Sequence, residues 1–155
     1  MAERPRPIEE RTAKPQPAGE DDEPRIALVD GANAAYSVKA DGASLRNLLL
    51  IRDAVADDGL DPIIIADAAL RHAIDDRTRY EAMVKTGEIR QAPAGTDADY
   101  FLLAFARELD ARIVSNDRFG DRASGFPDAQ ERIIRFMIVK GEVVLERRAD
   151  PRREE

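Results

Sequence analysis

Hydrophobic residues between positions 26 and 145 form two alternating kinds of segment. The apolar runs at 26–29 and 62–66 are too short for helices. The second is β-branched, which is typical of a strand buried on both faces of a sheet. Between them, apolar residues recur at helical spacing after Ser44, a candidate N-cap, until the Asp-Asp-Gly at 57–59. The pattern predicts strand, helix and strand.

The same alternation continues along the chain. A polar segment near 75–86 predicts a helix that ends at Gly87, and a short strand follows at 88–91. Segment 96–109 is apolar on nearly all sides, which predicts a buried helix, and 111–115 predicts the next strand. Strands that alternate with helices favour a parallel α/β sheet with short right-handed crossovers.

Smaller elements are expected after residue 126. A short helix opens at Pro127 and includes 131–133. Apolar strands at 136–139 and 143–145 flank Gly141, a pattern typical of a β-hairpin. We expect this hairpin at one edge of the sheet.

Both ends of the chain differ from this region. Residues 1–25 hold five of the nine prolines and one large aliphatic residue after Met1, which is too little apolar surface to offset the entropy of ordering. Residues 148–155 are similar. We therefore expect one folded domain over 26–147 between two disordered tails.

Composition excludes several classes of site. The chain has no cysteine and only one histidine, His72, so disulfides, thiolate zinc sites and multi-histidine metal sites are absent. Any bound metal must be a hard cation with oxygen ligands. No apolar run approaches the roughly 18 residues of a membrane span, and no apolar signal segment opens the chain. We expect a cytoplasmic protein without a membrane partner.

Three acidic side chains lie where predicted strands end or a helix begins. Asp30 closes the strand 26–29, Asp117 follows the strand 111–115, and Asp99 lies in the first turn of the helix 96–109. The carboxyl ends of parallel strands meet at one edge of a sheet, so we expect these side chains to converge. Carboxylates held together repel one another unless a cation lies between them. The sequence predicts a pocket for Mg²⁺ or Mn²⁺.

Each acidic segment also has a simpler interpretation. Gly31 allows a sharp turn after Asp30 and Asn33 offers an amide to the site, but Asp-Gly is also an ordinary turn. Thr96 and Asp99 have the spacing of a helix capping box. Asp97 diverges from Asp99 on a helix, so we expect Asp99 as the ligand and Asp97 in support.

The third segment offers a further acid. If a helical turn starts at Asp117, then Asp121 shares its face, although Asp117 is equally placed to cap that turn. Asp67 follows the strand 62–66 on the same edge, where aspartate is also a common loop residue. Without Asp67 the candidate acids number five, Asp30, Asp97, Asp99, Asp117 and Asp121, which equals the net charge of −5 between 26 and 145. Basic residues elsewhere would then be free for a phosphate backbone.

Taken together, these segments resemble the Zc3h12a-like ribonuclease family, a NYN branch of the PIN-like nucleases. The resemblance rests on Ala-Leu-Val-Asp-Gly-Ala-Asn at 27–33, Asp-Tyr-Phe-Leu-Leu at 99–103 and Ile-Val-Ser-Asn-Asp-Arg-Phe-Gly-Asp at 113–121. It implies a three-layer Rossmann-like fold and a metal-dependent endoribonuclease acting on single-stranded or looped RNA. The cysteines of the zinc finger found in some animal members are missing, and 91–96 lacks their basic loop.

The resemblance also assigns roles to individual residues. It implies that Mg²⁺ or Mn²⁺ is held at Asp30, Asp99 and Asp117, with Asn33 beside the metal and Asp121 as a further catalytic acid. The basic candidates for contacts with RNA, each of which also fits an ordinary surface charge, are Arg71 with His72, Arg77, Arg79, Lys85, Arg118 and Arg122. We predict substrate contacts for Arg71, which follows a strand end, and for Arg118 and Arg122, which flank the proposed acids.

Two other functions fit the same residues. The first is a non-catalytic module for RNA or protein binding, which the acidic charge and the missing basic loop favour. The second is a phosphatase or nucleotide hydrolase with Asp30 as nucleophile, but such enzymes place a second aspartate where Ala32 stands. A homodimer fits this type of fold, although no sequence feature predicts one.

Overall fold

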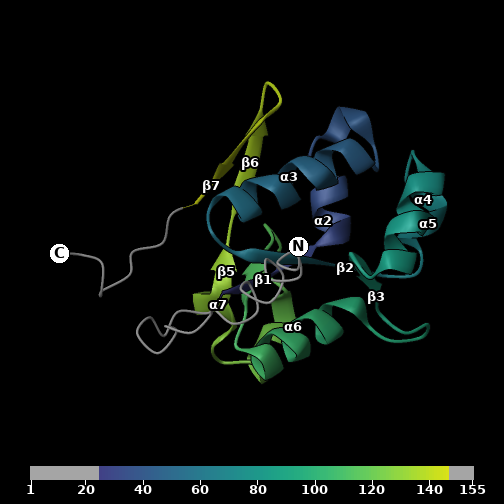
Figure 1. Ribbon diagram of the computed structural model, residues 1–155. Coiled ribbons are helices and arrows are strands. Elements are labelled where there is room, and N and C mark those ends of the chain that lie inside the picture. The colour runs from purple at the N-terminus through teal and green to yellow at the C-terminus, as the bar shows by residue number, and fades with distance from the viewer. Residues whose placement is uncertain (1–24, 147–155) are drawn as a thin grey trace, which may run out of the picture.

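A five-stranded parallel sheet forms the centre of the molecule (Figure 1). The computed structural model describes residues 25–146, so the expected tails lie outside the described residues apart from Arg25. The strand order is β3-β2-β1-β4-β5. The strands are β1 (Ile26–Asp30), β2 (Asp61–Ala66), β3 (Ile89–Gln91), β4 (Arg112–Val114) and β5 (Ile133–Ile134). The predicted parallel α/β fold is confirmed.

The order of the strands reverses next to β1. From β1 the chain moves outward through β2 to β3, and it then crosses back to place β4 on the other side of β1. A crevice opens at such a switch point, outside the carboxyl ends of the two strands. Asp30 ends β1 at this edge, and Asp117 follows β4 there.

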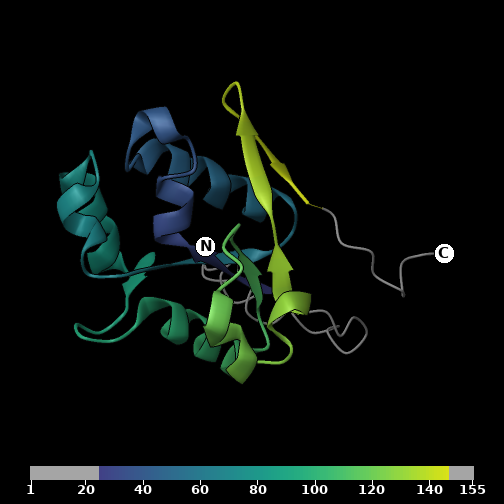
Figure 2. The same ribbon diagram turned by 180° about the vertical axis from the view of Figure 1, so that it is seen from behind.

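Helices cover both faces of the sheet (Figures 1 and 2). Alternate side chains of β1 enter two separate cores: Ala27 and Val29 pack on the α3 side, and Leu28 packs on the α6 side. The first layer holds α2 (Gly31–Ala35), α3 (Leu45–Asp57), α4 (Leu70–Ala73) and α5 (Arg77–Thr86). The second holds α6 (Ala98–Leu109) and α7 (Ala129–Arg132).

Helix α3 confirms the sequence prediction closely. The Ser44 hydroxyl accepts a hydrogen bond from the backbone N–H of Asn47 at 3.0 Å and so caps the helix. Of the apolar positions that predicted the helix, Leu45, Leu48, Leu49 and Val55 are buried and Ala56 is exposed.

The predicted hairpin is also confirmed, as β6 (Phe136–Val139) and β7 (Glu142–Leu145). It follows the edge strand β5, forms a separate antiparallel sheet and packs on the α3 side through Ile138 and Val143. It therefore extends the α3 layer instead of adding strands to the central sheet.

Two local expectations were wrong, and helix α2 was missed. Ile133 begins the strand β5, because its β-branched side chain and that of Ile134 pair with β4. The helix expected at 96–109 begins at Ala98 and buries only one face, and Tyr100 is 52% exposed. Helix α2 was not expected, since five residues are too few to show a helical pattern. Within residues 25–146, no helix has both the length and the apolar character to cross a bilayer.

Candidate active site

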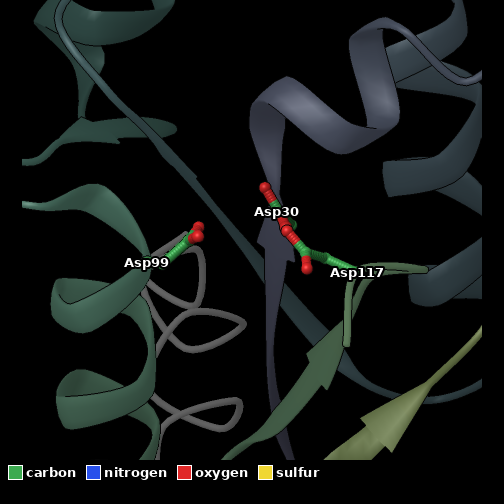
Figure 3. Close-up of side chains that lie close together, drawn as sticks. All are labelled: Asp30, Asp99 and Asp117. Atoms are coloured by element: carbon green, nitrogen blue, oxygen red, sulfur yellow. The ribbon is translucent and has the colours of Figure 1, made fainter. Parts of the chain in front are cut away.

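Three carboxylates from distant parts of the chain meet at the carboxyl edge of the sheet (Figure 3). Asp30 ends β1, Asp99 lies in the first turn of α6, and Asp117 lies in the loop after β4. One carboxylate oxygen from each lies within 4.8 Å of the others. Asp30 is only 9% exposed, while Asp99 and Asp117 are half-buried. The structure thus brings together the three acids that the sequence predicts as metal ligands.

A serine hydroxyl holds two of these acids in place. The Ser115 hydroxyl, fully buried, donates to Asp30 Oδ2 at 2.7 Å and accepts from the backbone N–H of Asp117 at 3.0 Å. The other oxygen of Asp30 caps α2 by accepting from the backbone N–H of Asn33 at 3.4 Å. Ser115 therefore ties the end of β1 to the loop after β4. Ser115 belongs to the motif at 113–121, but its residue type and spacing predict no role for it.

Asp117 lies in a tight turn. Its Oδ1 accepts a hydrogen bond from the backbone N–H of Phe119 at 2.7 Å, and Phe119 has a left-handed backbone with φ 63°. The helical turn expected to start at Asp117 is therefore absent. Asp121 lies in the 3-10 segment Gly120–Gly125, is exposed, and does not belong to the three-carboxylate group.

Gly31 is required for a different reason from the expected sharp turn. A Cβ at Gly31 would lie 2.8 Å from the carbonyl oxygen of Ile65. Glycine therefore lets α2 begin in contact with β2, and this contact sets the position of Asp30 at the start of the helix.

The environment of Asp30 and of Asp99 opposes the ionisation of these two acids. The pKa of Asp30 is raised to about 6, mainly because the carboxyl is buried; the hydrogen bonds from Ser115 and Asn33 oppose the rise, and the charges of Asp99 and Asp117 add to it. Burial and the neighbouring Asp117 also raise the pKa of Asp99. Crowded carboxylates with only oxygen donors are the ligand set that Mg²⁺ and Mn²⁺ take, so these residues fit such an ion.

A small cavity adjoins the acids. It has a volume of about 60 Å³ and is lined by Asp30, Asp99 and Asp67, among others. Asp67 also accepts from the backbone N–H of Leu70 at 3.0 Å, so it both caps the turn into α4 and faces the cavity. A volume of about 10–15 Å³ is enough for one water molecule, so the cavity has room for an ion with some of its waters.

Asp97 supports Asp99 through the helix that carries it. Asp97 is the N-cap of α6, where it accepts from the backbone N–H of Asp99 at 3.0 Å, and it also pairs with Arg122. The cap is thus Asp97 and not Thr96, and the expected capping box does not form. The Arg122 guanidinium holds the pKa of Asp97 below its usual range.

Asn33 and Asn116 connect the two loops of the site. Asn33 Oδ1 accepts from the backbone N–H of Asn116 at 2.8 Å. Asn116 in turn bonds both backbone groups of Phe136, donating from Nδ2 at 2.9 Å and accepting on Oδ1 at 3.0 Å. Phe136, the first residue of the terminal hairpin, is therefore held against Asn116, which immediately precedes Asp117 in the chain. The amide next to Asp117 was the only signal of this connection in the sequence.

The three predicted substrate arginines differ in their surroundings. Arg71 pairs with Glu81 at 2.6 Å, and Arg122 pairs with Asp97. Arg118 is exposed and has no ion pair within residues 25–146. Among these three, Arg118 has the charge most available to a ligand.

Fold and site together define a class: an α/β domain of Rossmann-like type with an acidic site at the switch point of its parallel sheet. Comparison with protein families then identifies the chain within that class. The sequence model of the Zc3h12a-like ribonuclease NYN domain matches residues 23–154, so the chain belongs to this family. The resemblance carried by the three motifs is confirmed.

Solved structures with the same fold include two of nuclear proteinaceous RNase P 2 from Arabidopsis thaliana. The chain is 23% and 24% identical to them, with TM-scores of 0.62 and 0.63. The match covers 83% of this chain but only 31% and 30% of theirs, so the chain corresponds to about a third of that enzyme. None of the curated proteins compared with the chain matches it.

Proposed function

We propose that this protein is a metal-dependent endoribonuclease that hydrolyses phosphodiester bonds in single-stranded or looped RNA. The proposal is carried by the three carboxylates within 4.8 Å of one another at the switch point of the sheet. Membership of a ribonuclease family supports it, because the family motifs contain these same three residues.

Asp30, Asp99 and Asp117 would hold Mg²⁺ or Mn²⁺, directly or through water. Such an ion lowers the pKa of a bound water and offsets the negative charge that develops on phosphate. The protein's own contribution is to position the carboxylates: Ser115 orients Asp30, the turn at Phe119 orients Asp117, and Asp97 orients the helix that carries Asp99. Supporting contacts of this kind orient the ligands and thereby affect the affinity of the site for its ion.

Other residues would act around this centre. Asn33 fixes the geometry between the two loops, since its side chain already bonds the loop of Asp117. Arg118 would contact a phosphate, and Arg71 and Arg122 would do so in addition to their present ion pairs. Asp121 would assist from the exposed segment after Phe119 by orienting water.

A non-catalytic module for RNA or protein binding is the second candidate. It is favoured by one observation: two of the three predicted substrate arginines are already neutralised by carboxylates. Metal-dependent cleavage separates the two candidates, because a binding module would keep the fold without turnover.

The test is cleavage of a labelled single-stranded RNA by wild type and by Asp117→Asn, each with Mn²⁺, with Mg²⁺ and with EDTA. The asparagine oxygen can still accept from the N–H of Phe119, so we expect the variant to fold and to lose cleavage. Thermal unfolding of both proteins controls for folding. Activity that persists in the variant or in EDTA would contradict the proposed site. A folded wild type without activity would favour the binding module.

A further inference from the structure

Tyr100 is an exposed aromatic residue directly beside one of the acids of the site. It is 52% exposed, although the sequence predicts that its helix is apolar on nearly all sides. Asp99 precedes it in the first turn of α6, so the two Cα atoms are about 3.8 Å apart. A large aromatic side chain thus remains open to solvent next to a proposed metal ligand.

Tyr100 faces the chain segment that follows Asp117. Its ring contacts the ring of Phe126, with the centroids 5.5 Å apart and the planes at 62° to each other. Between Asp117 and Phe126, Arg122 pairs with the residue that caps α6. This segment therefore runs along the start of α6, where Asp99 and Tyr100 are adjacent. Tyr100 and two of the three acids lie along one seam of the molecule.

The partner ring holds Tyr100 in a defined position. Phe126 is 7% exposed and packs in the core on the α6 side of the sheet. The guanidinium of Arg107 lies 4.7 Å from the centroid of the Phe126 ring, so a cation restrains Phe126 in addition to the core. A tyrosine that is held by a buried neighbour loses little further conformational entropy when a ligand stacks on it. The ring of Tyr100 is therefore preorganised.

Part of the Tyr100 ring is left without a partner. An edge-to-face contact such as that with Phe126 covers at most one face of a ring. Among residues 25–146, the Tyr100 side chain makes no second ring contact and its hydroxyl has no hydrogen bond. Proteins that bind single strands use exposed aromatic rings as platforms, because every base has a face that can stack. A flat aromatic ligand is therefore the class of ligand that this side chain fits.

We propose that Tyr100 stacks on an unpaired base next to the scissile phosphate and thereby selects single-stranded over paired RNA. The inference rests on the proposed function and adds a contact for a base to a site that otherwise binds phosphate. A nucleobase is favoured over a protein side chain because the ring lies beside the acids, where the phosphate of the same strand would bind. A base in a duplex must leave its stack and its partner before it can reach such a ring, and that step costs free energy.

The first test measures binding without cleavage. In the Asp117→Asn background, fluorescence anisotropy gives the affinity for a labelled single-stranded RNA. Tyr100→Leu keeps an apolar side chain against Phe126 but has no aromatic face. Both Tyr100→Leu and Tyr100→Ala should weaken binding about tenfold, within the range measured for loss of one stacked base. Tyr100→Phe keeps the aromatic face and should stay within about twofold of the parent protein.

Tyr36→Leu is the matched control. Tyr36 is 50% exposed, much as Tyr100 is, but it ends α2 in the layer on the opposite face of the sheet, so its substitution should leave the affinity for RNA unchanged. Thermal unfolding identifies any variant that fails to fold. In the otherwise wild-type protein, Tyr100→Leu should bind Mn²⁺ as wild type does, which separates the loss of a base contact from a shift of Asp99.

A second test locates the contact on the RNA. A single abasic nucleotide is moved along the strand, and its effect on affinity is compared between the Asp117→Asn protein and the same protein with Tyr100→Leu. Removal of the base that stacks should weaken binding about tenfold in the first protein and hardly at all in the second, because both changes remove the same contact. If every position has the same effect in both proteins, Tyr100 contacts no base and the inference is overturned.

Cleavage by the otherwise wild-type enzyme separates this inference from the proposed function. Tyr100→Leu should raise KM for single-stranded RNA with little change in kcat, and should thereby lower the preference for single-stranded over paired RNA. A fall in kcat alone would mean that Tyr100 only supports Asp99, and would overturn the stacking role. If wild type cleaves RNA and Tyr100→Leu behaves like Tyr36→Leu, this inference alone fails. If wild type neither binds nor cleaves RNA, the proposed function fails as well.

Discussion

Asp30→Asn should stabilise the metal-free protein while abolishing its function. The carboxylate of Asp30 is 9% exposed, and burial raises its pKa from 3.8 to about 6. An acid with a raised pKa in the folded state adds stability that is complete below its unfolded pKa and is lost as the pH rises through the folded pKa. Above about pH 6 the folded protein therefore carries an ionised, buried Asp30 at a cost in stability.

The size of this cost follows from the two pKa values. At 1.36 kcal/mol per pKa unit, the difference between 3.8 and about 6 corresponds to about 3 kcal/mol at pH 8. An asparagine removes the charge and keeps the contacts, because its oxygen can accept from Asn33 and its NH₂ can donate to the Ser115 hydroxyl. We therefore expect a gain of up to about 3 kcal/mol in EDTA at pH 8 and almost none at pH 4.

Urea unfolding at several pH values, in EDTA, measures this difference directly. Asp61→Asn is the matched control, since Asp61 is exposed at the opposite end of the sheet and should change stability by less than about 0.5 kcal/mol. Added Mn²⁺ should stabilise wild type, by about 2.7 kcal/mol at 100 times its Kd, and should leave Asp30→Asn almost unchanged. A gain that is the same at pH 4 and pH 8, or no gain at all, would refute the argument from burial.

Three further substitutions test the supports of the site. Ser115→Ala removes the hydroxyl that bonds Asp30 and the N–H of Asp117. It should lower the free energy of unfolding in urea by about 2 kcal/mol and weaken Mn²⁺ binding. An unchanged Kd for Mn²⁺ would show that Ser115 does not position the ligands. Asn116→Ala breaks both hydrogen bonds to Phe136 and should lower kcat for RNA cleavage more than it raises KM. A change in melting temperature alone would indicate a purely structural role for Asn116. Gly31→Ala places a Cβ 2.8 Å from the carbonyl oxygen of Ile65 and should lower the free energy of unfolding by about 1–3 kcal/mol. A variant as stable as wild type would contradict this contact.

Local patterns predicted most of the elements because the forces that shape them act over a few residues. The cap at Ser44 and the apolar spacing after it define α3, and the β-branched run at 62–66 defines β2. The elements that the patterns missed are very short. Helix α2 and strand β5 contain five and two residues, and their conformations depend on contacts with β2 and β4 that lie far away in the sequence.

The sequence alone predicted that Asp30, Asp99 and Asp117 meet. Asp30 and Asp117 come at the ends of strands, Asp99 comes at the start of a helix, and the geometry of a parallel sheet places all three at one edge. Spacing along the chain could not show that Asp121 lies outside this group, because the turn at Phe119 replaces the helical turn that would have aligned it with Asp117.

Only the tertiary structure decided what surrounds the acids. The Ser115 hydroxyl lies between Asp30 and the loop of Asp117, and that contact spans 85 residues of sequence. The hydrogen bond from the backbone N–H of Asn116 to Asn33 Oδ1 likewise spans 83 residues. Hydrogen bonds and charges act through space, so their partners are set by how the layers pack, whereas the strand and helix patterns are set by neighbouring residues.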